Sequence, residues 1–180
     1  EIGGYLQQNY GLLVTADGGE LVELPRQPSA MNSIMRAGKL TLEPSGALRG
    51  EVDETRLGDR ASAERWRLRT VDKSSDRIKP IEDLLAGSLS LFRITQASMI
   101  NLNETSQPFG FHYAFEVQSY AKDVGGLLLV RPRVLGVKTS GILETREPRQ
   151  FPIEFEGPSR DTDTFDIKIP AGYVVDDIPP

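Results

Sequence analysis

The chain has 180 residues, of which 38% are hydrophobic and 26% are charged, and its formal net charge is −5. This composition is typical of a folded globular protein and lacks the basic footprint of a nucleic-acid-binding protein. The absence of cysteine excludes disulfides, thiolate nucleophiles and Cys-ligated metals, and no long uninterrupted apolar run predicts a membrane span.

The first predicted element is a β-hairpin. The short apolar runs Gly11–Thr15 and Glu20–Leu24 flank Ala16-Asp17-Gly18-Gly19, a Gly-rich break that indicates a tight turn. Two prolines within residues 25–29 then end the strand and begin a linker.

A second hairpin is predicted from Lys39–Leu42 and Ala47–Val52, which flank Glu43-Pro44-Ser45-Gly46. Proline at the second position and glycine at the fourth favour a type I turn.

Two short helices are predicted to follow. Asp59–Val71 contains neither Gly nor Pro, and Asp59 suits the N-cap. In the second helix, Lys79–Ala86, Pro80 suits a first helical position and Gly87 the residue just past the end. The predicted apolar faces are Ala63, Trp66 and Val71 in the first helix and Ile81, Leu84 and Leu85 in the second.

From Leu91 the pattern returns to strands. Phe92–Leu102 is a predicted strand with imperfect alternation. Val124-Gly125-Gly126 breaks the chain before Leu127–Val130, whose continuous apolar run predicts a strand buried on both faces, and Gly136–Gly141 is a predicted loop. A further strand is predicted to carry a row of aromatic side chains on one face, and this apolar face must be covered. The aromatic row comprises Phe109, Phe111, Tyr113 and Phe115.

The last predicted elements are two strands joined by a turn. The loop between them is Gly157–Asp163, which is built from turn-forming residues. Period-two alternation predicts one dry face on each strand, carried by Phe151, Ile153 and Phe155 and by Phe165, Ile167 and Ile169.

This order of elements predicts a mainly β (α+β) fold, because strands and helices that do not alternate favour an antiparallel sheet. The expected architecture is antiparallel and β-sandwich-like, with two short helices between the early hairpins and the later strands. Residues 1–90 would hold the hairpins and helices, and residues 91–180 the sandwich-like unit, with a boundary near Ser90.

The residues that could carry chemistry are interpreted as structural. His112 is the only histidine and is predicted on the strand face opposite the aromatic row. Asp161, Asp163 and Asp166 have spacings resembling a calcium loop, but the central Gly and twelfth-position Glu of an EF-hand are missing. Loop carboxylates that accept backbone N–H bonds are the favoured interpretation of these three residues.

The remaining acidic and aromatic candidates receive similar interpretations. Acid/base pairs could be drawn from Glu51, Asp53 and Glu54 or from Glu144 and Glu147, but solvated charges are favoured. The sequon Asn103-Glu104-Thr105 matters only in a secreted eukaryotic protein. The aromatic row could stack on sugars, but its Phe-rich composition favours core packing. No catalytic, cofactor-binding or metal-binding residue is predicted, and no cofactor is expected.

Four sequence motifs together resemble a known region. They are Gly18–Pro25, Gly46–Val52, Arg149–Phe155 and Ile169–Pro179, of which the most specific is the series R-x-x-P-I-x-F, then I-P-x-G-Y-x-V and I-P. In order and spacing they resemble the β-rich carboxy-terminal region, of unassigned function, that follows the papain-like core in exported bacterial transglutaminase-like proteins. The resemblance covers nearly the whole chain.

The resemblance implies a non-catalytic accessory domain rather than an enzyme. The family's Cys-His-Asp triad would lie before Glu1, and none of it carries over to this chain. The implied partner is the transglutaminase-like core of the same polypeptide, or a cell-envelope protein or glycan, and the implied location is periplasmic or extracellular. The family pattern continues past Pro180, so an unpaired sheet edge is also expected. The alternatives are an independent glycan- or peptidoglycan-binding module and an assembly domain that pairs through its sheet edges.

Overall fold

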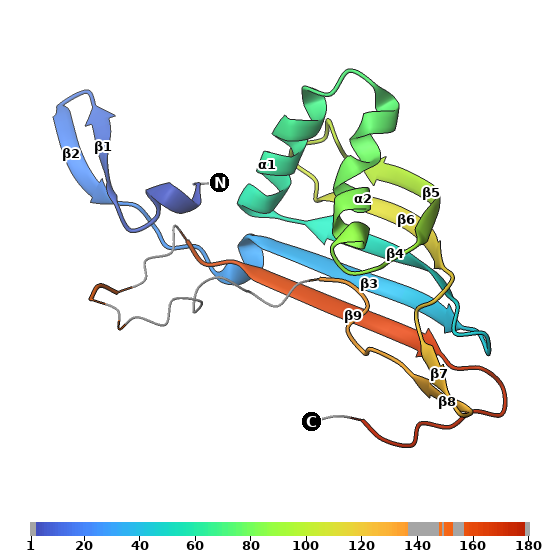
Figure 1. Ribbon diagram of the computed structural model, residues 1–180. Coiled ribbons are helices and arrows are strands. Elements are labelled where there is room, and N and C mark those ends of the chain that lie inside the picture. The colour runs from blue at the N-terminus through green and yellow to red at the C-terminus, as the bar shows by residue number, and fades with distance from the viewer. Residues whose placement is uncertain (1–2, 137–147, 149, 153–156, 179–180) are drawn as a thin grey trace.

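A computed structural model of the chain, shown in Figure 1, describes residues 3–136, 148, 150–152 and 157–178. Its centre is a five-stranded sheet with the strand order β5-β6-β4-β3-β9. These strands are β3 (Ser33–Leu42), β4 (Leu48–Arg56), β5 (Phe92–Ile100), β6 (Phe109–Val117) and β9 (Arg160–Lys168). All neighbouring pairs are antiparallel except β3 and β9, which are parallel.

The remaining elements cover one face of this sheet or lie beyond its edges (Figure 1). The helices α1 (Gly58–Arg69) and α2 (Lys79–Ala86) lie over one of its faces (Figure 1). Two separate hairpins are formed by β1 (Tyr10–Thr15) with β2 (Gly18–Glu23) and by β7 (Lys122–Val124) with β8 (Leu127–Leu129). The described residues also form three 3₁₀ helices, η1 (Gly4–Leu6), η2 (Ser29–Met31) and η3 (Ser74–Ile78).

The mainly β, α+β class is confirmed, but the sandwich is not. Within the described residues, one five-stranded layer packs on a layer of helices, and no second sheet covers its other face. Strands from both sides of the boundary predicted near Ser90 share this sheet, so that position does not separate two sheets.

Both early hairpins are confirmed. The turn of the second hairpin is closed by the Gly46 N–H, which donates to the Glu43 carbonyl over 2.9 Å. Gly46 has φ +82°, a conformation that glycine adopts without the steric cost of a side chain. β3 begins earlier than predicted, at Ser33, and is ten residues long.

The aromatic row forms the centre of the core, as predicted. Its four side chains on β6 are each at most 1% exposed. Phe109 and Phe111 meet edge to face with their ring centroids 5.0 Å apart, a favoured aromatic geometry. Leu48 and Val52 on β4, together with Leu68 of α1 and Leu85 of α2, belong to the same buried cluster.

The first helix exists as predicted, but its predicted cap and apolar face are wrong. Leu57 is the N-cap residue, while the Asp59 carboxylate accepts a 2.6 Å hydrogen bond from the Gly4 N–H. Ala63 and Trp66 are exposed. The residues that α1 buries are Gly58, Ala61, Glu64, Arg65 and Leu68. The apolar-face rule fails because two buried positions are charged, and opposite charges or carbonyls satisfy them.

The second helix is confirmed over the predicted range. Pro80 lies in its first turn and Gly87 is the C-cap residue. Of its predicted apolar face, Ile81 and Leu85 are buried and Leu84 is half-buried.

Two later predictions are corrected or explained by pairing. Leu127 and Leu129 are exposed, because β8 pairs only with β7 in a two-stranded hairpin, so the prediction of a strand buried on both faces is wrong. The imperfect alternation in β5 has a physical cause, which is a register shift between Ile94 and Gln96 that marks a β-bulge at Thr95.

The last strand also differs from its prediction. β9 begins at Arg160 rather than after the predicted loop, and it pairs in parallel with β3. Of its predicted dry face, Phe165 and Ile167 pack on the core, whereas Ile169 lies beyond the strand and is exposed, so the prediction is wrong for that residue. Phe151 and Pro152 lie outside any strand. Residues 153–156 and most of the predicted loop Gly136–Gly141 fall outside the described residues.

Candidate functional site

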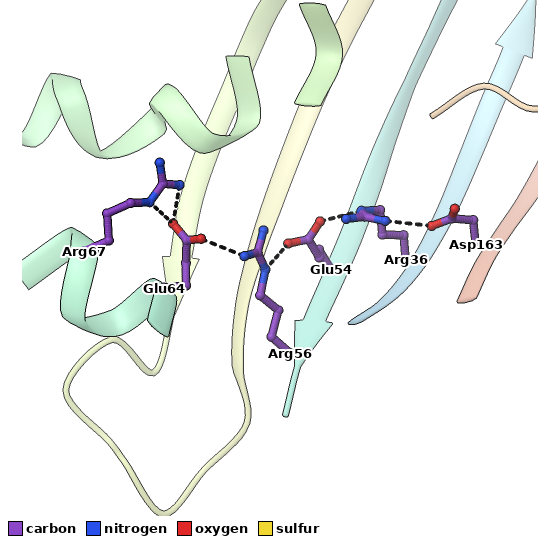
Figure 2. Close-up of polar contacts among 6 residues, drawn as sticks. All are labelled: Arg36, Glu54, Arg56, Glu64, Arg67 and Asp163. Carbon is purple, nitrogen blue, oxygen red and sulfur yellow. Dashed lines mark hydrogen bonds and ion pairs between the residues drawn. The ribbon is translucent and has the colours of Figure 1, made fainter. Parts of the chain in front are cut away.

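A chain of six alternating charges crosses the helix-covered side of the sheet (Figure 2). The Arg36 Nε donates to Glu54 Oε2 and the Arg56 Nε donates to Glu54 Oε1, both over 2.6 Å. One guanidinium nitrogen of Arg36 also donates to Asp163 over 3.0 Å, and one of Arg56 donates to Glu64 over 2.7 Å. In spatial order the members are Asp163, Arg36, Glu54, Arg56, Glu64 and Arg67.

This charge chain connects elements that are distant in sequence, namely β9, β3, β4 and α1. The side chain of Glu54 is 1% exposed and shares its two oxygens between two arginines. Burial lowers the pKa of the Arg36 guanidinium, but Glu54 and Asp163 more than offset this and raise the pKa above its usual value. Every buried charge of this charge chain is therefore paired, which is the condition under which buried charges are tolerated. This arrangement orients strands and a helix and offers no free acid or base.

Tyr113, a member of the aromatic row, lies beside this charge chain. Its hydroxyl is buried and has no hydrogen-bond partner among the described residues. Burial, together with the negative charge of Glu54, raises the pKa of this hydroxyl above its usual value. A phenol that loses its proton less readily is a poorer acid and nucleophile, so its position does not favour catalysis.

The opposite face of the sheet is polar and open. His112 Nδ1 lies 2.7 Å from Asp53 Oδ1 across the β4–β6 pair, which places His112 on the face opposite the aromatic row, as predicted. A shallow hollow of about 810 Å³ on this face is lined by residues that include Lys39, Glu51 and Glu116. Mixed charges in an open hollow are what a solvated sheet face presents.

The acids singled out in the sequence do not converge. Asp161, Asp163 and Asp166 lie along a strand rather than in a loop, so the prediction of loop carboxylates is wrong. Asp163 joins the charge chain and Asp161 lies 3.7 Å from Arg60. Within the described residues, no three His, Asp or Glu side chains gather in a way that could hold a metal ion.

The other predicted acids divide between the two faces of the sheet. Glu51 and Asp53 are exposed, as expected of solvated charges, whereas Glu54 is buried, so the solvated interpretation is wrong for that residue. Glu144 and Glu147 lie outside the described residues. Neither the period nor the spacing of the sequence predicted which residues would pair with Glu54 and allow it to be buried.

The sequon lies between β5 and β6, where backbone carbonyls bind an arginine. Arg65 of α1 donates to the carbonyls of Asn101, Glu104 and Gln107 at 2.6–3.2 Å. Its guanidinium also lies over the Phe109 ring, 5.6 Å from the centroid. These hydrogen bonds tie the loop to α1.

The feature that stands out as a surface is the β1–β2 hairpin. Tyr10, Leu12, Val14 and Leu21 are between 65% and 76% exposed, and we call these four residues the hairpin surface. The pairings Leu12 with Leu21 and Tyr10 with Glu23 place the four on one face of the hairpin. Leu13, on the other face, is half exposed. Single exposed apolar residues are ordinary, but a cluster of this kind marks an interaction site.

The base of the hairpin is anchored, while its tip projects away from the rest of the chain (Figure 1). The Gly4 N–H binds Asp59 of α1, and the Gln27 N–H donates to the Gln7 side-chain oxygen over 2.9 Å. The Leu24 N–H donates to the Asn9 carbonyl over 2.8 Å and closes the base. The sequence predicted this hairpin but gave no sign that its apolar side chains would be uncovered.

No protein-family model, no curated protein and no solved structure matches this chain. None of the described helices has the length and apolar character needed to cross a membrane.

Proposed function

We propose that this chain is the non-catalytic carboxy-terminal accessory domain of an exported bacterial transglutaminase-like protein, and that it docks on the core of that protein through the hairpin surface. The observation that carries the proposal is the exposed apolar face formed by Tyr10, Leu12, Val14 and Leu21. The resemblance supplies the identity of the partner.

A two-stranded hairpin is at best marginally stable in water and gains stability when its apolar face is covered. Burying a large apolar side chain contributes on the order of 1.5–3 kcal/mol, so four such residues can drive association even after its entropic cost. Because Leu13 on the other face is also half exposed, a cleft that receives both faces would cover the hairpin better than a flat surface.

The position of the hairpin in the chain favours a partner in the same polypeptide. In the transglutaminase-like layout the core comes before this region, and the hairpin, at Tyr10–Glu23, comes before the five-stranded sheet in the sequence. A covalent connection within one polypeptide raises the effective concentration of the core at the hairpin, to about millimolar levels for a short flexible linker, so a modest surface is enough. The docked domain would then shape access to the active site of the core in the periplasm or outside the cell.

A glycan- or peptidoglycan-binding module is the second candidate. The aromatic row is buried, so its rings are not available to stack on sugars. Tyr5 and Tyr10 are about 70% exposed, and tyrosines with an exposed ring are suited to stacking on sugars. Sedimentation of the chain with purified cell wall distinguishes the two candidates, because only the module would be pulled down in the absence of the core.

The docking proposal is tested by titrating the transglutaminase-like core of the parent protein with this chain in a calorimeter. The informative variant is Leu12→Asp with Leu21→Asp, which places two charges at paired positions of the hairpin surface. The matched control is Val174→Asp with Val175→Asp, which charges two other exposed valines. We expect the hairpin variant to abolish binding and the control to retain it.

Equal binding by both variants would contradict the docking surface. The non-catalytic part of the proposal is tested separately, by assaying the chain for amidase, protease and acyl-transfer turnover. Robust turnover by the chain itself would contradict it, whatever the docking result.

A further inference from the structure

The two edges of the five-stranded sheet differ in how they are protected. Strand β9 carries five charged residues in its sequence RDTDTFDIK, whereas β5 carries one in FRITQASMI. Within the described residues, no strand pairs with the outer side of either. Charges on an edge strand discourage pairing with another chain, and an edge strand with few charges invites it. The edge at β5 is therefore the one suited to accept a further strand.

A groove lies along this edge, beside α2. It has a volume of about 430 Å³ and is lined by Ile78, Glu82 and the β5 residues from Phe92 to Ala97, except Arg93. Phe92, Ile94 and Ala97 are half-buried, so they give the groove an apolar floor with room for contact. The rim at α2 bears the exposed carboxylate of Glu82, which forms no ion pair with any described residue.

The bulge at Thr95 limits what can pair here. A bulge twists a strand and interrupts the regular ladder, which discourages long pairing between two identical edges. A short segment that pairs beside the groove avoids this restriction. The geometry thus favours a short extended peptide over a second copy of β5.

We propose that the outer edge of β5 binds a short extended peptide segment of a partner as an additional strand. Main-chain hydrogen bonds to β5 would supply the affinity, as in other cases of strand addition. Alternate apolar side chains of the peptide would rest on Phe92, Ile94 and Ala97. A basic residue of the peptide would pair with Glu82, which gives the site its preference. This site is distinct from the hairpin surface and does not depend on the proposed function.

The test uses the intact chain and a displayed library of short random peptides. Enriched peptides are synthesised and titrated by fluorescence anisotropy. We expect them to alternate apolar and polar residues and to include a basic residue. Their binding should slow amide hydrogen exchange in Phe92–Ile100 and leave exchange in the β1–β2 hairpin unchanged.

Two charge reversals on α2 carry the same risk to stability, but only one of them lies on the groove. Glu82→Lys reverses the charge at the rim, and Asp83→Lys reverses an exposed charge that does not line the groove. We expect Glu82→Lys to weaken binding about fivefold or more, in line with the loss of a rim ion pair, and Asp83→Lys to leave it unchanged. Ala97→Glu, checked for folding by circular dichroism, should abolish binding by placing a charge on the floor.

Three outcomes would overturn the proposal. They are the absence of any enriched peptide, protection of the hairpin instead of β5, and equal effects of the two charge reversals on α2. Association of two copies through β5 in light scattering would likewise replace the peptide with a second chain as the occupant.

Discussion

The five-stranded sheet and the β1–β2 hairpin differ in which side chains they bury and which they expose. The sheet buries charged residues, with Glu54 and Arg36 at 2% and 8% exposure, while the hairpin leaves Leu12 and Leu21 at least 65% exposed. Polarity alone therefore does not decide burial in this chain. The sheet has an opposite charge for each ion that it buries, so these charges need no outside partner. The hairpin has no cover for its apolar face among the described residues, so it is suited to a partner.

The largest effect is expected from breaking the charge chain at its centre. Glu54→Gln would leave the guanidiniums of Arg36 and Arg56 without their shared counter-charge. Each arginine keeps one other carboxylate, Asp163 or Glu64, so the expected loss is that of hydrogen bonds between charged groups, about 1.5–3 kcal/mol of the free energy of unfolding. Urea denaturation followed by circular dichroism measures it.

The matched control is Glu43→Gln, which removes an exposed ion pair with Arg49. Exposed pairs contribute about 0–1 kcal/mol, so this variant should stay near the wild type. If the two variants lost similar stability, the buried charge chain would not be what holds the sheet and α1 together.

A smaller effect of opposite sign is expected at Tyr113. Its buried hydroxyl lacks a partner among the described residues, so Tyr113→Phe should raise the free energy of unfolding at neutral pH by about 1 kcal/mol. Because the pKa of Tyr113 is raised above 10.0 in the folded state, the folded chain holds this proton when the unfolded chain has lost it. Stability is thus full below pH 10 and falls as the pH rises further, by up to about 1.4 kcal/mol per pH unit.

Denaturation series at neutral and alkaline pH check both parts of this prediction. The free energy of unfolding of Tyr113→Phe should fall less at alkaline pH than that of the wild type. The exposed control Tyr10→Phe should behave like the wild type. A less stable Tyr113→Phe protein would mean that the hydroxyl has a stabilising partner.

The smallest effect on stability is expected in the hairpin. Leu12→Asp with Leu21→Asp changes exposed residues and removes no core contact, so the two facing carboxylates weaken the β1–β2 pairing and leave the packing of the five-stranded sheet unchanged. Urea denaturation should therefore give nearly the wild-type midpoint. A large loss of stability would show that the hairpin surface packs on the chain itself, which would remove the contrast with the sheet.

The sequence predicted what depends on local pattern. The turn at Glu43–Gly46, the helix Lys79–Ala86 and the aromatic row on β6 all follow from spacing and turn chemistry, and the structure confirms them. The pattern failed where distant partners decide. Trp66 was expected inside and Glu54 outside, but Glu54 is buried because two arginines, one on a neighbouring strand, bind it.

Pairing and cover were also beyond the sequence. The strand that contains Phe165 and Ile167 was recognised, but its parallel pairing with β3 depends on a contact across more than a hundred residues. The hairpin was predicted from Gly18 and Gly19, yet its exposure is a property of the folded chain. The sequence therefore predicted the two strands that carry the hairpin surface, which is the candidate site. It did not predict that the apolar side chains of these strands would be exposed.

We propose that the buried charges of the sheet need no partner, whereas the hairpin surface is covered by the transglutaminase-like core. Amide hydrogen exchange, measured by mass spectrometry on this chain with and without that core, tests it most directly. We expect exchange in Tyr10–Glu23 to slow strongly when the core is added, while β4 and β6 are slow in both samples. Unchanged exchange in the hairpin, with new protection elsewhere or nowhere, would contradict it.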